Sequence, residues 1–223
     1  MLEIILDTET TGLSTKEKHR IIEIGCVELK NQIATGKVFH TDLNPQRAVS
    51  EDAYKIHGYT DEFLSNKKKF SEIAEVFLNF INNKKIIIHN APFDLSFLNY
   101  ELRIAGKKEI DIKNVIDTLE LARQKYPGTQ NSLDALCKRF NIDNAKREKH
   151  SALLDCHLLK EVYINLLDLK EPKLNFKNVE LTETNFERNK SRNKSRKIVS
   201  ITEEELMKHK EYIKKDLTKN FFN

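Results

Sequence analysis

Leu2-Glu-Ile-Ile-Leu-Asp-Thr-Glu9 is a short apolar run that ends in two carboxylates, a pattern typical of a buried strand that reaches the edge of a sheet. Two further stretches, residues 21–28 and 37–43, also favour strands, and Gly36 is the expected turn residue between them. Strands joined by so short a turn predict an antiparallel meander at the start of the fold.

After the meander, the spacing of apolar residues becomes helical and alternates with short strands. Strands are predicted at residues 85–89 and 115–117. Four helices are predicted from apolar residues that recur at helical spacing: Phe70, Ile73, Phe77, Phe80 and Ile81; Phe93, Phe97, Leu98 and Leu102; Leu133, Leu136, Cys137 and Phe140; Leu153, Leu154, Leu158, Val162 and Leu166. A hairpin series followed by alternating strands and helices predicts an α/β fold, a mixed sheet covered by helices.

Composition limits the class of protein. Of the 223 residues, 39% are hydrophobic and 32% are charged, and no stretch approaches the roughly 20 apolar residues that a membrane-spanning helix needs. The N-terminus has no basic segment and an acid interrupts its apolar run, so we expect no secretory signal peptide. Cys26, Cys137 and Cys156 are an odd number without close pairs, which favours small buried residues in a reducing cytoplasm.

The excess positive charge lies near the C-terminus. Residues 1–170 contain 25 Lys and Arg against 25 Asp and Glu, whereas residues 171–223 contain 13 against 9. The neutral front part would therefore not bind nucleic acid through a bulk positive field. Residues 189–196 are a repeat, Asn-Lys-Ser-Arg twice, which is too polar to build a core.

A helix is predicted after this basic repeat. Thr202 and Glu205 have the spacing of a capping box, and a thin apolar stripe follows at Leu206, Ile213 and Leu217. An isolated helix with so thin a stripe is not stable in water, so it should bind a partner. The predicted organisation is a globular domain over residues 1–170, a flexible basic linker over 171–200 and an amphipathic helix over 201–223.

Four acids and one histidine stand at predicted strand ends or helix starts, where a sheet could bring them together. Asp7 and Glu9 share one side of their strand because alternate residues of a strand share a face. Each residue has an ordinary explanation as well: acids at strand ends are usually solvated, acids in a first helical turn are favoured by the helix dipole, and a lone histidine is usually a surface residue. The set is Asp7, Glu9, Asp94, Asp155 and His150.

If these four carboxylates gather, they cannot all ionise without a counter-charge. Two Mg²⁺ or Mn²⁺ ions would relieve the repulsion, because such ions prefer carboxylate oxygens. Two ions about 3.5–4 Å apart can stabilise both the attacking and the leaving oxygen of a phosphoryl displacement. A neutral imidazole suits the removal of a proton from the attacking water, and His150 is the candidate base.

Three segments resemble the exonuclease motifs of the DEDDh family: Asp7-Thr-Glu-Thr-Thr-Gly12, His89-Asn-Ala-Pro-Phe-Asp94 and His150-Ser-Ala-Leu-Leu-Asp155. Within that family the chain is similar to the proofreading epsilon subunits of bacterial DNA polymerase III. The further matches are Ile21-Ile-Glu-Ile-Gly25, His57-Gly58, Asp61-Glu-Phe63, Asn131-Ser-Leu-Asp-Ala-Leu-Cys137 and Ile142-Asp-Asn144. The resemblance implies a ribonuclease H-like fold, a five-stranded mixed sheet with helices on both faces.

The resemblance also implies an activity for residues 1–170: 3′→5′ hydrolysis of a DNA strand that releases nucleoside monophosphates. It implies that Asp7, Glu9, Asp94 and Asp155 hold two divalent cations, Mg²⁺ or Mn²⁺, and that Asp7 bridges them. His150 would be the general base.

Contacts with the nucleotide are implied for Asp7, Glu9 and Asp155 of the same set. His57 matches a position that contacts the bound nucleotide in the family. Asp52 stands where the family has Glu, and it is a further candidate for substrate binding.

The resemblance implies partners in addition to a DNA 3′ end. These are the catalytic alpha subunit of DNA polymerase III, bound through the C-terminal tail, and a small theta-like accessory subunit. A sliding clamp is a further family partner, but no Gln follows Gln130, so the Gln-containing clamp motif is absent or disguised. We expect residues 202–219 to bind in a groove of the partner, with the linker raising the local concentration of nuclease. The expected location is the cytoplasmic replisome.

Two other functions remain open at this point. One is an exoribonuclease of the same fold that trims RNA ends, which the motifs do not exclude. The other is a scaffold subunit whose main role is to stabilise a polymerase. All five chemical positions are present, which argues against a purely structural role.

Overall fold

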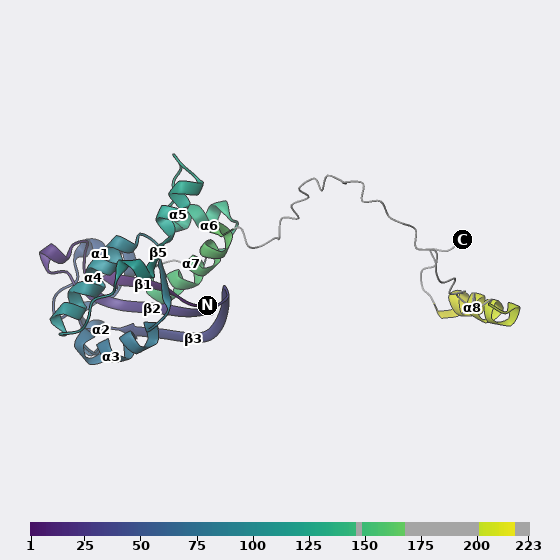
Figure 1. Cartoon of the computed structure of the whole chain (residues 1–223), viewed down its shortest axis with the longest axis horizontal. Coiled ribbons are helices and arrows are strands. Elements are labelled where there is room, and N and C mark those ends of the chain that lie inside the picture. The colour runs from purple at the N-terminus through teal and green to yellow at the C-terminus, as the bar shows by residue number, and fades with distance from the viewer. Residues whose placement is uncertain (146–148, 168–200, 217–223) are drawn as a thin grey trace, which may run out of the picture. The chain divides into compact units, whose positions relative to one another are not determined.

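A mixed sheet forms the centre of the computed structural model, which describes residues 1–145, 149–167 and 201–216. The chain divides into two units, Met1–Lys173 and Leu174–Asn223, and the sheet belongs to the first (Figure 1). Its strand order is β3-β2-β1-β4-β5. The strands are β1 (Leu2–Thr10), β2 (Ile21–Lys30), β3 (Ile33–Asp42), β4 (Lys85–Ile88) and β5 (Val115–Asp117).

Helices connect and cover these strands. The α-helices of the first unit are α1 (Glu51–His57), α2 (Asp61–Ser65), α3 (Phe70–Ile81), α4 (Ala91–Ile104), α5 (Thr118–Lys125), α6 (Leu133–Arg139) and α7 (Ala152–Leu166). Two short 3₁₀ turns, Thr15–Glu17 and Ile112–Asn114, complete it. The second unit contains α8 (Glu203–Asp216). No described helix is both long and apolar enough to span a bilayer.

Apolar side chains are buried on both faces of the sheet, because alternate residues of β1 point to opposite sides. Ile4 and Leu6 pack in one cluster with residues of α3 and α4, such as Phe77 and Phe97. Ile5 packs in a second cluster, which includes Cys156, Leu159 and Tyr163 of α7. The predicted α/β fold, a five-stranded mixed sheet with helices on both faces, is confirmed.

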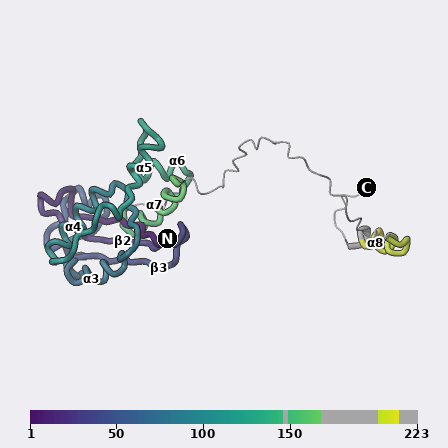
Figure 2. Tube along the Cα trace, viewed as in Figure 1, coloured from purple at the N-terminus to yellow at the C-terminus, as the bar shows by residue number. Residues whose placement is uncertain are grey.

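The predicted meander is also confirmed. β1 pairs antiparallel with β2, and β2 pairs antiparallel with β3; the neighbouring β2 and β3 can be followed along the trace in Figure 2. On its other side β1 pairs parallel with β4, and β4 pairs parallel with β5. Parallel pairing brings the ends of β1 and β4 to the same edge of the sheet, where the candidate residues follow.

The predicted turn at Gly36 is wrong. Strand β3 already starts at Ile33, and the turn is made by Asn31 and Gln32, whose φ angles are +51° and +62°. Two positive φ angles in succession are the conformation of a tight hairpin turn, and Asn tolerates it better than most residues. Gly36 lies inside β3 with φ +86°, where the register between β2 and β3 shifts. Its positive φ therefore accommodates a bulge-like irregularity of the strand.

Each of the four helices predicted from apolar spacing is present, as α3, α4, α6 and α7. In α8 the capping box is confirmed: the Thr202 N–H donates to Glu205 Oε2 at 3.0 Å, and the Glu205 N–H donates to Thr202 Oγ1 at 3.4 Å. Leu206 and Met207 of α8 are exposed. The predicted linker and the end of the apolar stripe lie outside the described residues, so the three-part organisation stays a prediction.

We expect Gly25→Ala to destabilise the first unit, because the backbone at the start of α7 lies directly against this glycine of β2. A Cβ atom on Gly25 would lie 2.5 Å from the carbonyl carbon of Ala152 and 2.6 Å from the Leu153 nitrogen, and backbone cannot rotate away. Overpacking of this kind costs about 1–3 kcal/mol. A thermal melt measures the loss. Gly36→Ala separates the two causes of loss: its methyl group meets nothing within 4 Å, so any destabilisation there comes from the φ of +86°, which disfavours Ala. An unchanged melting temperature for Gly25→Ala would contradict the close approach.

Candidate active site

Asp7 and Glu9 occupy the end of the central strand β1. Alternation along the strand places both on the side of Ile5, which is the face covered by α7. In the pairing with β2, Asp7 lies opposite Gly25 and Glu9 lies opposite Glu23. The strand thus presents two carboxylates toward the start of α7.

Asp155 and His150 come from the start of α7. Asp155 lies in its first turn and is buried, and His150 stands two residues before the helix. His150 Nδ1 lies 3.4 Å from Asp155 Oδ2, and the His150 N–H donates to the Ile56 carbonyl at 3.2 Å. Ligand atoms of Glu9, His150 and Asp155 all lie within 4.8 Å of one another. Residues more than 140 positions apart in the chain therefore share one site.

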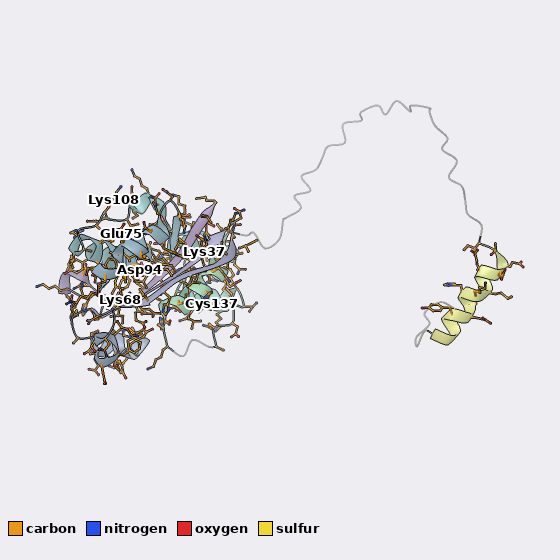
Figure 3. All side chains as sticks on the ribbon, turned by 90° about the horizontal axis from the view of Figure 1, so that it is seen from below. Lys37, Lys68, Glu75, Asp94, Lys108 and Cys137 are labelled. Atoms are coloured by element: carbon orange, nitrogen blue, oxygen red, sulfur yellow. The ribbon has the colours of Figure 1, made fainter. Side chains whose placement is uncertain are left out.

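Asp94 reaches the same edge of the sheet from α4, which begins three residues after β4 ends. The turn into the helix is made by Asn90 with φ +68°. Asp94, labelled in Figure 3, is buried. It accepts hydrogen bonds from the Thr8 N–H at 3.1 Å and from Thr8 Oγ1 at 2.6 Å. Thr8 therefore holds Asp94 against the strand segment that carries Asp7 and Glu9.

The carboxylates interact strongly with one another. Burial raises the pKa of Asp7 well above its ordinary value, and the charges of Asp94, Glu9 and Asp155 raise it further. Burial also raises the pKa of Asp94, to about 7, although the hydrogen bonds from Thr8 oppose the change. Without a counter-charge, the folded site therefore retains protons that free aspartates would lose.

This donor set fits a hard divalent cation. It offers carboxylate oxygens from Asp7, Glu9, Asp94 and Asp155, and these are the ligands that Mg²⁺ and Mn²⁺ prefer. The mutual repulsion that raises the pKa of Asp7 is the repulsion that such a cation would remove.

His57, a predicted nucleotide contact, lies at the end of α1 and is buried. Its Nδ1 accepts from the Tyr59 N–H at 3.0 Å, so the ring proton is on Nε2, which has no hydrogen-bond partner of good geometry among the described residues. The pKa of His57 is lowered, chiefly by burial. A hydrogen bond with the Thr10 backbone opposes this shift, so the ring donor is directed at the end of the strand that carries Glu9. The contact of His57 with a nucleotide stays a prediction.

Asp52, the other predicted substrate residue, has a different environment. It lies in the first turn of α1, its side chain is 93% exposed, and Lys55 pairs with it at 3.4 Å. The structure does not bring Asp52 into the group formed by Glu9, His150 and Asp155. Its role in substrate binding stays a prediction.

Sequence reasoning missed Glu23. This carboxylate lies in β2, is fully buried, and faces the start of α7 through hydrogen bonds to Ser151 and Ala152. The available signal was an acid inside an otherwise apolar strand, Ile21-Ile-Glu-Ile-Gly25.

Comparison with known proteins assigns the family. A protein-family profile described as "Exonuclease" matches residues 4–163, which is most of the chain. The chain belongs to this exonuclease family. The predicted enzyme class, a 3′→5′ exonuclease, is therefore confirmed, as is the similarity to epsilon subunits.

Several relatives of this exonuclease carry the name "DNA polymerase III subunit epsilon". The protein of Rickettsia typhi is 49% identical over 225 residues, which cover 96% of both chains. That of Rickettsia felis is 46% identical over 95% of both chains. The protein of Escherichia coli K12 is 40% identical over 73% of this chain and 70% of its own length.

Solved structures support the fold. Exonuclease X, solved in complex with 5′-overhanging duplex DNA, is 25% identical with a TM-score of 0.59, and the match covers 75% of this chain and 92% of that one. The nuclease domain of 3′hExo, a DEDDh family member bound to rAMP, is 17% identical with a TM-score of 0.65 over 76% of this chain and 92% of that one. The ribonuclease H-like architecture is that of these exonucleases.

Proposed function

We propose that this exonuclease is the proofreading epsilon-type subunit of a bacterial DNA polymerase III and removes nucleotides from the 3′ end of a DNA strand. The observation that carries the proposal is the meeting of Asp7, Glu9, Asp94 and Asp155 beside His150, from β1, α4 and α7. The names of relatives that match 95% or more of the chain support the polymerase assignment. A subunit of that assembly would act in the cytoplasm, on the chromosome.

The reaction is hydrolysis of the terminal phosphodiester. The oxygen of water forms a bond to phosphorus, the bond from phosphorus to the 3′ oxygen of the preceding nucleotide breaks, and a nucleoside monophosphate leaves. His150 would take the proton of the attacking water, and solvent would supply a proton to the released 3′ oxygen. His150 is 42% exposed, so its ring is accessible to water at the mouth of the site.

Asp7, Glu9, Asp94 and Asp155 would hold two divalent cations, Mg²⁺ or Mn²⁺. When bound, such cations stabilise negative charge on the attacking and leaving oxygens. The protein's own part is to fix the ligands: Thr8 orients Asp94, and the first turn of α7 orients Asp155. His57 would contact the nucleotide, and Asp52 would act at the periphery of the substrate.

Selectivity for a mispaired end follows from the cost of drawing the terminus into the site. An unpaired terminal nucleotide needs no base pair to be broken first, so it enters more easily. The first unit carries equal numbers of acidic and basic residues up to residue 170, so it would not hold duplex DNA by bulk charge. A polymerase partner would supply that affinity.

The decisive experiment compares three 5′-labelled primers: a DNA with a 3′ mismatch, the matched DNA, and an RNA of the same sequence. With Mg²⁺ or Mn²⁺, we expect the mispaired DNA to be shortened fastest, in steps of one nucleotide that the 5′ label makes visible. Asp7→Asn serves as the inactive control. If the RNA were shortened faster than the DNA, the exoribonuclease alternative would be favoured. If no primer were shortened, the alternative of a scaffold subunit would be favoured.

The proposed polymerase contact is α8. Its exposed Leu206 and Met207 give it an apolar side, and the capping box defines its start. We expect Leu206→Asp in the full chain to weaken binding to the purified catalytic alpha subunit by at least about tenfold, since an apolar anchor in a groove contributes more than 1.4 kcal/mol. Calorimetry measures the affinity, and exonuclease activity on short oligonucleotides should not change.

Lys208→Asp is the matched control for this contact, because Lys208 lies on the opposite side of α8 from Leu206 and pairs with Glu204. Equal binding by wild type and Leu206→Asp would exclude α8 as the anchor. Contacts with a theta-like subunit and with a sliding clamp are further expectations from the family resemblance.

A further inference from the structure

Glu23 is a fully buried carboxylate in the apolar strand β2, directly opposite Glu9 of the active site. A buried carboxylate is costly unless it accepts several hydrogen bonds. It stands within Ile21-Ile-Glu-Ile-Gly25, one of the segments that resemble the epsilon subunits, and it is not among the proposed cation ligands.

Four donors surround the carboxylate of Glu23. Oε1 accepts from His40 Nε2 at 2.8 Å and from Ser151 Oγ at 2.9 Å. Oε2 accepts from the Tyr59 hydroxyl and from the Ala152 N–H, both at 2.9 Å. The donors come from β3, from the segment after α1 and from the start of α7. Glu23 therefore joins three parts of the fold through one side chain.

At α7 the carboxylate acts as a helix cap supplied by a distant residue. The first N–H groups of a helix have no partner inside the helix and attract negative charge. Ser151 occupies the N-cap position but makes no capping hydrogen bond to α7; its hydroxyl donates to Glu23 instead. The Ala152 N–H donates to the same carboxylate. The start of α7 is thus fixed by β2.

Gly25 fixes the same helical turn by close packing. Its missing side chain lets the Ala152 backbone approach to a distance that no Cβ atom would allow. Cys156 Sγ also donates to the Gly25 carbonyl, at 3.1 Å. Together, the hydrogen bonds of Glu23 and the contact at Gly25 determine both the position and the rotation of the first turn of α7.

We infer that Glu23 is a positioning residue of the exonuclease, which holds His150 and Asp155 in their working places by fixing the start of α7 between them. His150 lies two positions before Ala152 and Asp155 three positions after it, so both move if that turn moves. Through Tyr59, whose ring packs on His57 with centroids 5.3 Å apart, the same carboxylate reaches the segment proposed to contact the nucleotide. The inference rests on the roles proposed above for His150 and Asp155.

A cation site is the other interpretation of this cluster, because ligand atoms of Glu23, His40 and Asp42 lie within 4.8 Å of one another. Both oxygens of Glu23 already accept two hydrogen bonds each, which uses the acceptor capacity of the carboxylate. Asp42 pairs with Lys67 at 3.2 Å. The hydrogen-bonding pattern therefore favours positioning.

The test compares Glu23→Gln with Glu28→Gln in the full chain. Glu28 is a matched control: it is a buried carboxylate of the same strand, but Lys84 and Thr35 satisfy it away from the site. In metal-free protein, hydrogen exchange followed by mass spectrometry should show amides 152–155 exchanging at least about tenfold faster in Glu23→Gln, and unchanged in Glu28→Gln. This readout does not depend on activity.

With Mg²⁺, kcat for a single-stranded oligonucleotide should fall about 10²-fold in Glu23→Gln, as for a small misplacement of catalytic groups, whereas KM should stay within a factor of about 2. If Glu23 had only a structural role, both variants would lose stability to a similar extent, and kcat would not fall while KM stayed constant. If Glu23→Gln does not fold, Tyr59→Phe and Ser151→Ala each remove one donor and should lower kcat without raising KM.

The inference would be overturned if amide exchange at residues 152–155 did not change in Glu23→Gln. It would also be overturned if kcat of Glu23→Gln, or of both donor variants, equalled that of Glu28→Gln. Either result would leave the proposed function intact. If the wild-type protein did not cleave DNA, the proposed function would be overturned instead. The exchange experiment would still show whether Glu23 fixes the start of α7.

Discussion

Asp7→Asn is expected to abolish exonuclease activity and, at the same time, to raise the melting temperature of the metal-free protein. Asp7 lies among Asp94, Glu9 and Asp155, and their charges together with burial oppose its ionisation. Asn removes that repulsion but offers a poorer ligand to a cation. The rate should fall at least about 10³-fold, because cation binding at such a site supplies several kcal/mol of transition-state stabilisation.

The direction of the stability change follows from linkage. The folded pKa values of Asp7 and Asp94 lie above the unfolded value of 3.8. For such groups the folded state binds more protons, so stability falls as pH rises from 3.8 through the folded pKa, which is about 7 for Asp94. At a pH above both folded pKa values, the metal-free wild type is destabilised by the charges of both Asp7 and Asp94. Asp7→Asn lacks the charge at position 7, so it should be more stable than wild type there.

Thermal melts in chelator and in Mg²⁺ measure both effects. Mg²⁺ should raise the melting temperature of wild type more than that of Asp7→Asn, because the variant binds the cation less well. Asp111→Asn is a control, since Asp111 only caps a short turn by accepting from the Lys113 N–H at 2.9 Å. A strongly destabilised Asp7→Asn in chelator would show that the four carboxylates do not repel one another as described.

His150→Ala is expected to lower the rate about 10²–10⁴-fold, which is the usual contribution of a positioned general base. Cation binding should be largely kept, because the four carboxylates remain. Single-turnover cleavage of an oligonucleotide measures the first effect, and the Mg²⁺-induced shift in melting temperature measures the second.

His157→Ala is the matched control for the base. His157 is an exposed histidine of the same helix, α7, two positions beyond Asp155. Its replacement should leave both the cleavage rate and the Mg²⁺ effect unchanged. If His150→Ala cleaved as fast as wild type, the proton would have to be taken by another group.

The sequence predicts those parts of this fold that depend on local patterns. Leu2–Leu6 is an apolar run, as expected for a strand buried on both faces, and the stripe from Phe70 to Ile81 follows the helical period; both elements were predicted. Helices α1, α2 and α5 were missed, because they have five to eight residues each and too short an apolar pattern. Side-chain caps such as Ser50, which accepts from the Ala53 N–H, and tertiary contacts hold them in place.

The candidate site also has residues that local patterns predict and residues that they do not predict. Asp7, Glu9, Asp94, Asp155 and His150 could be named because each stands at a recognisable boundary of an element, and the motifs resemble a family. The partners of Glu23 could not be named, since Ser151 and Ala152 lie 128 and 129 residues away and only the folded chain brings them together. The contact of His40 Nε2 with Glu23 Oε1, at 2.8 Å, likewise has no local pattern that would predict it.

The alternation of Asp7, Thr8 and Glu9 has a consequence for how this enzyme can diverge. Asp7 and Glu9 face α7, whereas Thr8 turns the other way and holds Asp94 of α4. Inserting or deleting a single amino acid in β1 ahead of Asp7 would exchange the two faces, and with them the acids and the hydroxyl. The apolar residues of β1 can therefore be exchanged for one another during evolution, whereas the number of residues before Asp7 cannot change without misplacing the acids.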